Sequence, residues 1–296
     1  MSSSHRVAFI GLGAMGFPLA GHLVRAGLSV SVFNRTRGRA ESWATAHQGV
    51  IADSPAAAAS GADFAMVCVG NDDDVRSVVF GDSGVLAGLA PGATLIDHTT
   101  TSAALAEELG SACEQRGIGF IDAPVSGGQA GAENGALTIM VGGEAAQFEH
   151  ARPVLESYAK AIRLMGPVGA GQLTKMVNQI CIAGVLQGLS EALFFAERAG
   201  LDINEVVSAI SQGAAQSWQM DHRHQTMASG DFDFGFAVNW MRKDLGIAMT
   251  AAHRLGINLP ITELVDSFYA DVQTLGGGRW DTSSLIQRLR EQQNIT

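Results

Sequence analysis

The chain has 296 residues, of which 47% are hydrophobic and 16% charged, and its formal net charge is −10. This length allows two domains, and the composition excludes a disordered chain. The negative charge argues against a general nucleic-acid-binding protein, although a locally basic site can still bind an anionic substrate. We therefore expect a compact enzyme with a small-molecule partner and no nucleic acid.

Three cysteines are present, Cys68, Cys113 and Cys181, and none belongs to a C-x-x-C motif. An odd number of cysteines without regular spacing indicates reduced thiols, which favours a cytoplasmic location. The first six residues are polar and lead directly into an apolar run, so we expect no signal peptide. No uninterrupted apolar stretch reaches the roughly 18 residues of a membrane span, so no membrane partner is expected.

A glycine-rich turn follows the first apolar run, 7–10, and precedes a stretch with apolar residues at helical spacing. Strand, glycine turn and helix in this order are the context in which G-x-G-x-x-G binds a dinucleotide. The first glycine would make the tight turn, the second would admit the pyrophosphate, and the third would let the helix pack closely. The alternative is a turn without a ligand, and we favour the dinucleotide site. Its residues are Gly11, Leu12, Gly13, Ala14, Met15 and Gly16.

Short apolar strands alternate with alanine-rich helical stretches in the first half of the chain. This alternation predicts an α/β fold with a mainly parallel, doubly wound Rossmann sheet. Ligands of such a sheet bind beyond the carboxyl ends of the strands. The expected strands are 7–10, 29–33, 64–69, 94–97, 119–122, 137–141 and 162–165, with helices such as 102–116 and 144–158 between them.

The residues after the second strand bear on the choice of cofactor. An acidic residue at this place would bind the ribose 2′-hydroxyl of NAD, but the sequence has Asn34, Arg35, Thr36 and Arg37. Arg35 and Thr36 would instead receive a 2′-phosphate, with Arg37 adding positive charge. The alternative is a solvated basic turn. We favour NADP over NAD.

Polar residues also follow the third and fourth expected strands. Gly70 and Asn71 would lie against the cofactor, and Asp72–Asp74 would begin a helix. Three adjacent aspartates suggest a metal, but no further ligand is near, and carboxylates commonly cap a first helical turn and interact with its dipole. We therefore predict capping and no metal. Thr100 can cap the next helix or reach a ligand, and His98 is interpreted as structural rather than as a proton donor.

A second glycine-rich segment, Ser126-Gly127-Gly128, follows the fifth expected strand. Its consecutive N–H groups and hydroxyl form a nest that suits a carboxylate, and the alternative is a flexible loop. Beyond Gly166 the strand patterns give way to helical ones. We predict a dinucleotide-binding domain over residues 1–166, followed by an all-α domain for substrate binding and oligomerisation over 167–296.

A long helix is predicted from Gln172 to Ala199, because this stretch lacks proline, and its apolar content nearly all round predicts burial. Lys175 near its start faces a helix dipole and desolvation, which both disfavour its charge. Its pKa would then move toward neutrality and allow proton transfer, unless its amine reaches solvent. Asn178 lies one turn later and could bind a substrate oxygen or orient the amine.

Four blocks of sequence resemble the β-hydroxyacid dehydrogenase family. This family includes 3-hydroxyisobutyrate dehydrogenase, tartronate semialdehyde reductase and the glyoxylate/succinic semialdehyde reductases. The resemblance covers nearly the whole chain. The blocks are 11–18, 122–128, 169–179 and 243–245.

The resemblance implies hydride transfer between NAD(P) and a small β-hydroxyacid or its semialdehyde, with Lys175 as the catalytic residue. It also implies substrate contacts from Ser126, Gly127, Gly128 and Asn178. Thr100 and Lys243 would contact the cofactor or the region between cofactor and substrate. A homodimer or homotetramer is expected from the family and from the apolar faces of the helical domain.

Two other functions are weighed against this one. An imine reductase of related architecture would lack a lysine at the position of Lys175, and a regulatory nucleotide-binding subunit would not need it. His222 and His224 do not share a helix face and have no third ligand, so a metal site is rejected. The pocket walls are expected from Trp218, Met220, Phe234, Phe236 and Trp240.

Overall fold

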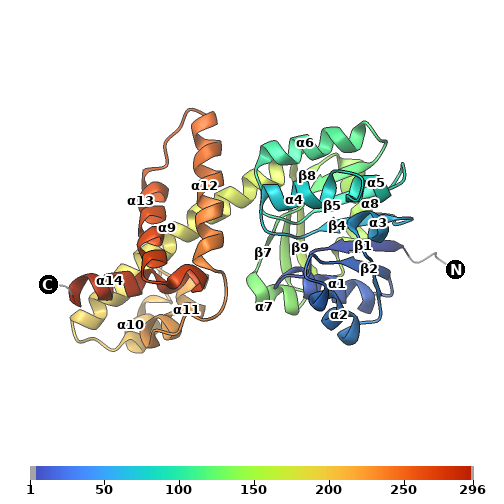
Figure 1. Cartoon of the computed structure of the whole chain (residues 1–296). Helices are drawn as coiled ribbons and strands as arrows, with labels where there is room; N and C mark the ends of the chain where they lie inside the picture. The colour runs from blue at the N-terminus through green and yellow to red at the C-terminus, as the bar shows by residue number, and fades with distance from the viewer. Residues whose placement is uncertain (1–4, 295–296) are drawn as a thin grey trace. The chain divides into compact units, whose positions relative to one another are not determined.

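The computed structural model describes residues 5–294, and Figure 1 shows the course of the chain. The chain divides into two compact units, Met1–Lys175 and Met176–Thr296. This division falls inside helix α9 (Ala170–Arg198), whereas the sequence pattern places it at residue 166, before the helix. The first turn of α9 belongs to the first unit because it is hydrogen-bonded to strand ends there.

The first unit contains one nine-stranded sheet with the order β3-β2-β1-β4-β5-β6-β8-β7, and β9 pairs with β8. The strand order reverses beside β1, which is where a doubly wound sheet binds its ligand. The strands are β1 (Arg6–Ile10), β2 (Ser29–Phe33), β3 (Val50–Ile51), β4 (Phe64–Val67), β5 (Thr94–Asp97), β6 (Gly119–Asp122), β7 (Val125–Ser126), β8 (Leu137–Gly143) and β9 (Ala159–Gly166).

Helices cover both faces of this sheet, which confirms the doubly wound fold. Phe9 packs in a buried cluster with α1, α2 and α8, whereas Ala8 and Ile10 pack with α3 to α6. The central strand β1 is therefore buried on both sides. The helices are α1 (Gly16–Arg25), α2 (Arg37–Ala46), α3 (Pro55–Ala59), α4 (Asp72–Val79), α5 (Val85–Gly88), α6 (Ala103–Glu114), α7 (Gly128–Glu133) and α8 (Ala145–Leu155).

The pairing is parallel from β3 to β6, as the alternation of strands and helices predicts. Strand β8 instead runs antiparallel to β6 and β7. The chain returns through the short β7 and α7 rather than through a full crossover helix, which a parallel pair requires. The strands β3 and β7 were not expected, because two residues carry too little alternation to be detected.

The second unit is all helical among its described residues, apart from an isolated bridge between Ala237 and Asp281. Helix α11 was not expected, because its many polar side chains give no clear apolar stripe; Ser217 caps it by accepting a hydrogen bond from the Met220 N–H. The helices after α9 are α10 (Ile203–Ile210), α11 (Trp218–Ser229), α12 (Val238–Arg254), α13 (Pro260–Thr274) and α14 (Leu285–Asn294), with 3-10 turns at Gly277–Arg279 and Thr282–Ser284.

The long helix α9 is not buried all round, which corrects the expectation from its composition. Ala183 and Leu186 pack in the core of the second unit, but Val177 and Phe195 are 61% and 72% exposed. By length and composition alone, α9 could cross a membrane, since 18 of its residues reach a mean hydropathy of 1.4. The core helix of a folded domain meets the same criterion, and 44% of this window is buried within the fold.

Candidate active site

The glycine-rich turn between β1 and α1 has the geometry that its sequence predicts. Gly11 has a φ of +99°, and a Cβ at this residue would clash with the carbonyl oxygen of Cys68, so only glycine fits. A Cβ on Gly16 would clash with the carbonyl oxygen of Gly11, which explains the close approach of α1. No described atom lies within 4 Å of a Cβ built on Gly13, so this backbone is open to a ligand.

Asn34, which directly follows β2, is hydrogen-bonded to that turn. Its Oδ1 accepts a hydrogen bond from the Leu12 N–H at 2.9 Å, and its Nδ2 donates to the carbonyl oxygen of Thr36 at 2.9 Å. The residues 34–36 therefore lie beside the glycine turn, where the sequence places the adenosine end of a cofactor.

Two exposed arginines follow Asn34, and both already have carboxylate partners. The Arg35 side chain is 85% exposed and forms an ion pair with Asp74 at 3.1 Å. Arg37 forms an ion pair with Asp53 at 2.7 Å, which raises the pKa of its guanidinium. A 2′-phosphate would have to compete with Asp74 for Arg35.

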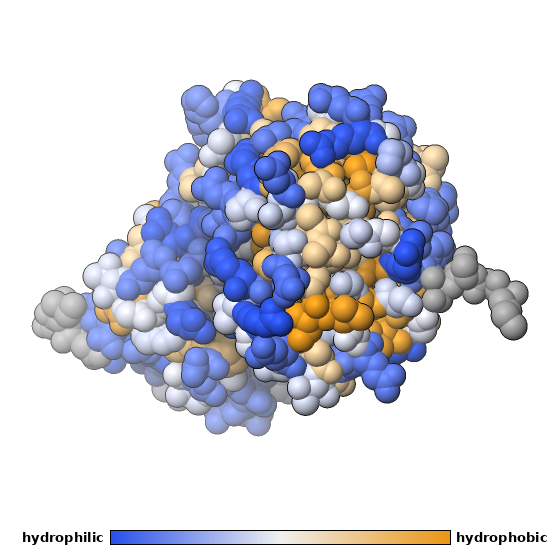
Figure 2. Space-filling view, turned by 45° about the vertical axis from the view of Figure 1, so that its right-hand side comes forward, coloured by the Kyte–Doolittle hydropathy of each residue, from blue (hydrophilic) through white to orange (hydrophobic). Residues whose placement is uncertain are grey.

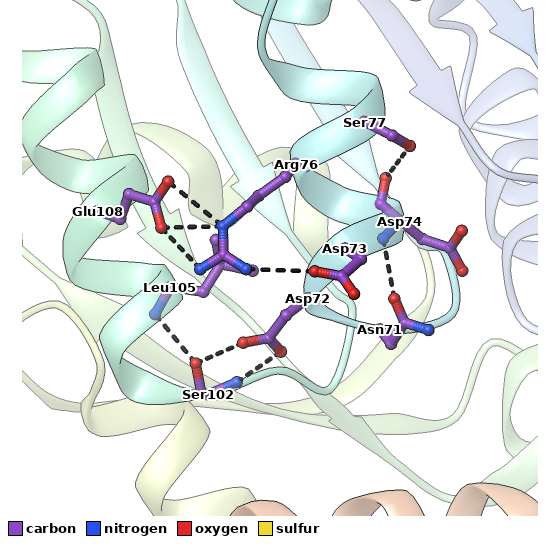
Figure 3. A network of polar contacts seen from close by, with 9 residues as sticks. All are labelled: Asn71, Asp72, Asp73, Asp74, Arg76, Ser77, Ser102, Leu105 and Glu108. Atoms are coloured by element: carbon purple, nitrogen blue, oxygen red, sulfur yellow. Dashed lines mark hydrogen bonds and ion pairs between the residues drawn. The ribbon is translucent and has the colours of Figure 1, made fainter.

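The first turn of α4 is capped by Asn71, whose Oδ1 accepts a hydrogen bond from the Asp74 N–H at 2.8 Å (Figure 3). The three aspartates of this turn lie where carboxylates interact favourably with the helix dipole, although the capping atom itself belongs to Asn71. Asp72 accepts hydrogen bonds from the Oγ and the N–H of Ser102, at 2.6 and 3.1 Å. Since Ser102 caps α6, the chain segments that follow β4 and β5 are tied together.

Gly70 and Thr100 are half-buried residues at these two strand ends. Their neighbours fix the local backbone, because Thr99 Oγ1 accepts a hydrogen bond from the Val69 N–H at 3.1 Å. The Thr99 N–H in turn donates to Asp97 Oδ1 at 2.9 Å. The structure thus brings both predicted cofactor residues to the carboxyl edge of the sheet.

His98 is buried and holds the end of β5 against the segment after β6. Its Nδ1 lies 2.7 Å from the carbonyl oxygen of Ala123, and its Nε2 lies 2.8 Å from the hydroxyl of Tyr158. Burial lowers the pKa of His98 to about 4, so the neutral ring donates from Nδ1 and accepts from Tyr158 at Nε2. These bonds support a structural role.

The segment Ser126–Gly128 connects β7 to α7. Gly127 and Gly128 have φ values of +131° and +63°, and both residues are exposed. Helix α7 is held against α1, because His22 Nε2 lies 2.9 Å from the carbonyl oxygen of Ala132 and 3.1 Å from that of Glu133. The loop therefore presents consecutive backbone N–H groups from an anchored position.

Asp122 is the last residue of β6, and its side chain binds the backbone at the start of α9. Its buried carboxylate accepts hydrogen bonds from the N–H groups of Gly169 at 2.7 Å and Gln172 at 2.9 Å. Burial raises the pKa of Asp122, while these N–H groups oppose the rise. The carboxylate thus satisfies N–H groups that a helix N-terminus leaves without partners in the helix.

Gln172 links the same turn of α9 to the end of β5. Its Nε2 donates to the carbonyl oxygen of Thr99 at 2.7 Å, and its Oε1 accepts from the Thr101 N–H at 3.0 Å. Lys175 follows three residues later and is buried, with 8% of its surface exposed. A buried lysine near the helix start is what the sequence predicts.

The second unit contains Asn178 and Lys243, which belong to one polar chain. Asn178 Nδ2 donates to Gln179 Oε1 at 2.7 Å, and Gln179 Nε2 donates to Asp244 Oδ2 at 2.6 Å. Asp244 Oδ1 forms an ion pair with Lys243 Nζ at 3.1 Å. Gln179 and Asp244 are each 1% exposed, so two buried side chains connect the two predicted residues.

The predicted pocket walls have different surroundings. Met220 is 4% exposed and belongs to a core cluster, and the half-buried Phe236 packs against another. Trp218 and Trp240 are 50% and 44% exposed. The Phe234 ring lies beneath the guanidinium of Arg223, 5.0 Å from its centre.

The two histidines of α11 each bond to the helix one turn earlier. His222 Nδ1 lies 2.9 Å from the carbonyl oxygen of Trp218, and His224 Nδ1 lies 2.7 Å from that of Met220. Within residues 5–294, no three His, Cys, Asp or Glu side chains are grouped as metal ligands.

Four buried polar residues that the sequence motifs do not identify as site residues hold the candidate residues in place. Asp97 and Asp122 end otherwise apolar strands, which is a detectable signal. Gln172 and Asp244 lie beside the candidate lysines in sequence, but only the structure shows their bonding partners.

The doubly wound sheet, the glycine turn and the all-α unit define a Rossmann-type dinucleotide-binding protein. Residues 6–166 match the family model described as the NAD binding domain of 6-phosphogluconate dehydrogenase. Residues 169–289 match the NAD-binding domain of NADP-dependent 3-hydroxyisobutyrate dehydrogenase. The chain therefore belongs to the β-hydroxyacid dehydrogenase family, as its four sequence blocks indicate.

Two similar proteins and one solved structure support this assignment over nearly the whole chain. An uncharacterized oxidoreductase of Shewanella frigidimarina is 58% identical and covers 97% of this chain and 98% of that protein. The 2-hydroxy-3-oxopropionate reductase of Escherichia coli is 34% identical, covering 96% and 97%. The structure of Mycobacterium tuberculosis 3-hydroxyisobutyrate dehydrogenase with L-serine has a TM-score of 0.87 at 33% identity, covering 97% and 99%.

Further solved structures are informative about the cofactor and the type of reaction. Psf3 in complex with NADP+ and 2-OPP has a TM-score of 0.87 at 28% identity, covering 96% of this chain and 99% of that one. Imine reductases and reductive aminases, at 18–21% identity and TM-scores of 0.60–0.66, share the fold alone. Family membership thus favours an NAD(P)-dependent oxidoreductase of the dehydrogenase type over an imine reductase.

Proposed function

We propose that the protein transfers a hydride between NADP and a small β-hydroxyacid or its semialdehyde, with Lys175 as general acid and base. The observation that carries this proposal is Lys175, a buried lysine at the start of α9 in a chain of this family. A regulatory subunit without turnover would have no need of a buried lysine at this place.

The residues around the glycine turn fit a dinucleotide. The positive φ of Gly11 and the open space at Gly13 suit a pyrophosphate, and Arg35 with Thr36 suits a 2′-phosphate. A bound nicotinamide would supply the hydride chemistry. The complete proposed cofactor set is Gly11, Leu12, Gly13, Ala14, Met15, Gly16, Asn34, Arg35, Thr36, Gly70, Asn71, Thr100 and Lys243.

The protein would bind the substrate and move the proton. The N–H groups of Ser126–Gly128 would bind the substrate carboxylate. Lys175 Nζ would donate a proton to the carbonyl oxygen during reduction and accept one from the hydroxyl during oxidation. Asn178 would orient that oxygen by a hydrogen bond.

Replacing Lys175 with alanine tests this role. We expect kcat to fall by about 10²–10⁴-fold, the range for loss of a general acid or base, whereas the Kd for NADPH should change by less than about twofold. The assay is a panel in which 3-hydroxyisobutyrate is oxidised with NADP+ or NAD+, while tartronate semialdehyde, succinic semialdehyde and glyoxylate are reduced with NADPH or NADH. Near-normal turnover by the variant would contradict the proposal, and activity with NADH alone would contradict the choice of NADP.

We further propose that the protein acts in the cytoplasm as a homodimer or homotetramer. Most of the exposed large apolar side chains belong to the second unit, including Leu255, Ile257 and Ile261 around the turn from α12 to α13. On the face drawn in Figure 2, apolar patches also interrupt the hydrophilic surface. Light scattering coupled to size-exclusion chromatography would test the assembly, and a monomer at micromolar concentration would contradict it.

A further inference from the structure

We propose that Gln172 and Asp122 are positioning residues that fix Lys175 relative to the ends of β5 and β6. This inference rests on the proposed function, in which Lys175 transfers the proton. All of the contacts that carry it lie within the first unit.

The Gln172 side chain acts as an additional peptide group at the end of β5. It is fully buried, and its amide donates to the Thr99 carbonyl oxygen at 2.7 Å while accepting from the Thr101 N–H at 3.0 Å. These two bonds enclose Thr100, the proposed cofactor contact. A primary amide donates and accepts at once at any pH, whereas an ionised carboxylate lacks the donor and an alkyl chain lacks both.

The Asp122 carboxylate holds the same turn of α9 through its backbone. It accepts hydrogen bonds from the Gly169 and Gln172 N–H groups, at 2.7 and 2.9 Å. Gly142 and Gly171 leave room for this contact, since a Cβ on either residue would clash with the carboxylate. Backbone and carboxylate therefore meet without a flexible side chain between them.

Lys175 follows Gln172 by three residues on α9, so the two positions are neighbours on the helix surface. A shift of the anchored turn would therefore move Lys175 with it. Displacing a catalytic group by about 1 Å can cost roughly 10²-fold in rate. Gln172 and Asp122 thus fix the position of Lys175 relative to the ends of β5 and β6. Cofactor and substrate are proposed to bind beside these strand ends.

The test uses Gln172→Met, which removes both amide bonds, and Gln172→Glu, which keeps only the acceptor when ionised. The matched control is Gln147→Met, because Gln147 Oε1 accepts a hydrogen bond from Thr94 Oγ1 at 3.2 Å, at the opposite end of β5. Full-length variants are assayed with the best substrate of the panel and the form of NADP that it requires, NADP+ for a hydroxyacid or NADPH for a carbonyl compound. NADPH binding is measured by fluorescence titration, and amide exchange of residues 99–101 is measured by mass spectrometry.

We expect Gln172→Met to lower kcat by about 10–100-fold, with KM and the NADPH Kd within about threefold of the parent. Exchange at residues 99–101 should rise in this variant and not in Gln147→Met. In Gln172→Glu the introduced carboxyl can donate to Thr99 only when protonated, and burial raises its pKa. Its kcat relative to the parent should therefore fall as the pH rises from about 5.5 to 8.5.

The outcomes separate this inference from the proposed function. Turnover by Gln172→Met within about twofold of the parent, or unchanged exchange at residues 99–101, would overturn the inference while Lys175→Ala remains inactive. Retained turnover by Lys175→Ala would instead overturn the proposed function. If Gln172→Met does not fold, a pH-independent kcat ratio for Gln172→Glu overturns the positioning role.

Discussion

The end of β2 and the ends of β5 and β6 lie at the same edge of the sheet and carry charged side chains, but they differ in burial. Arg35 at the end of β2 is 85% exposed and forms an ion pair with Asp74. Asp97 and Asp122 are buried and accept hydrogen bonds from backbone N–H groups. Exposed ion pairs contribute about 0–1 kcal/mol, whereas removing a partner from a buried charge costs about 3–5 kcal/mol.

This difference matches what each region is proposed to do. A residue that binds a charged group of the cofactor must give up its ion-pair partner within the protein when the cofactor binds. An exposed guanidinium in a weak ion pair can do so. A residue that fixes the place of Lys175 must have no competing partner, which requires a dry site with hydrogen bonds of defined geometry. The buried region should therefore respond strongly to substitution and pH, and the exposed region weakly.

Within the buried region, the carboxylates of Asp97 and Asp122 differ in their hydrogen-bond partners, although the two residues are direct neighbours in the register of β5 and β6. Asp122 receives the start of α9, while Asp97 Oδ2 has no hydrogen-bond partner among the described residues. Burial raises the pKa of Asp97 to about 7, the bonds to Thr99 oppose this, and the charge of Asp122 adds to it. Asp97 is thus a buried carboxylate whose ionisation the fold disfavours.

The largest expected effect is the pH response of Asp97→Asn. An unfolded aspartate has a pKa of about 3.9, so between about pH 4 and 7 the folded state binds more protons, and the free energy of unfolding falls as the pH rises. The fall attributable to Asp97 is roughly 4 kcal/mol. Asp97→Asn removes it, so urea unfolding should show the variant more stable than the parent at pH 8. Equal pH dependence of variant and parent would contradict this.

A somewhat smaller effect of opposite sign is expected for His98→Asn. The pKa of His98 is about 4 when folded and about 6.5 when unfolded, so its contribution is complete above pH 6.5 and is lost as the pH falls to 4. The loss is roughly 3 kcal/mol. The asparagine amide can still donate to Ala123.

These two variants form a matched pair, because in the parent the Asp97 and His98 contributions oppose each other between about pH 4 and 6.5. The free energy of unfolding should rise with pH in Asp97→Asn and fall with pH in His98→Asn. Unfolding at pH 4.5, 5.5 and 6.5 would measure both slopes. Parallel slopes in the two variants would show that neither group titrates as its burial indicates.

The sequence predicts the strands β1, β2, β5 and β6 to within one residue, because β1, β5 and β6 are mainly buried apolar runs and β2 alternates serine with apolar residues. It also predicts Rossmann pairing, the glycine turn and a buried lysine. It cannot predict that Gln172 bonds to Thr99 and Thr101, or that Asp122 receives the start of α9. Those contacts join residues about 50–70 positions apart, and nothing in local periodicity specifies which polar groups meet across such separations.

The smallest effect concerns the exposed region and cofactor preference. Asp74→Asn removes the negative charge that lies 3.1 Å from Arg35, while the helix cap remains, because it uses only the Asp74 backbone N–H. Since an exposed ion pair contributes at most about 1 kcal/mol, the Kd for NADPH should fall by no more than about fivefold, and the Kd for NADH should not change. The control is Asp53→Asn, which removes the same charge beside Arg37. An equal gain in affinity for NADPH and NADH, or a gain in NADPH affinity only in the control, would mean that Arg35 does not bind the 2′-phosphate. The contrast between an exposed charge that can exchange partners and a buried charge that cannot would then not apply to cofactor binding.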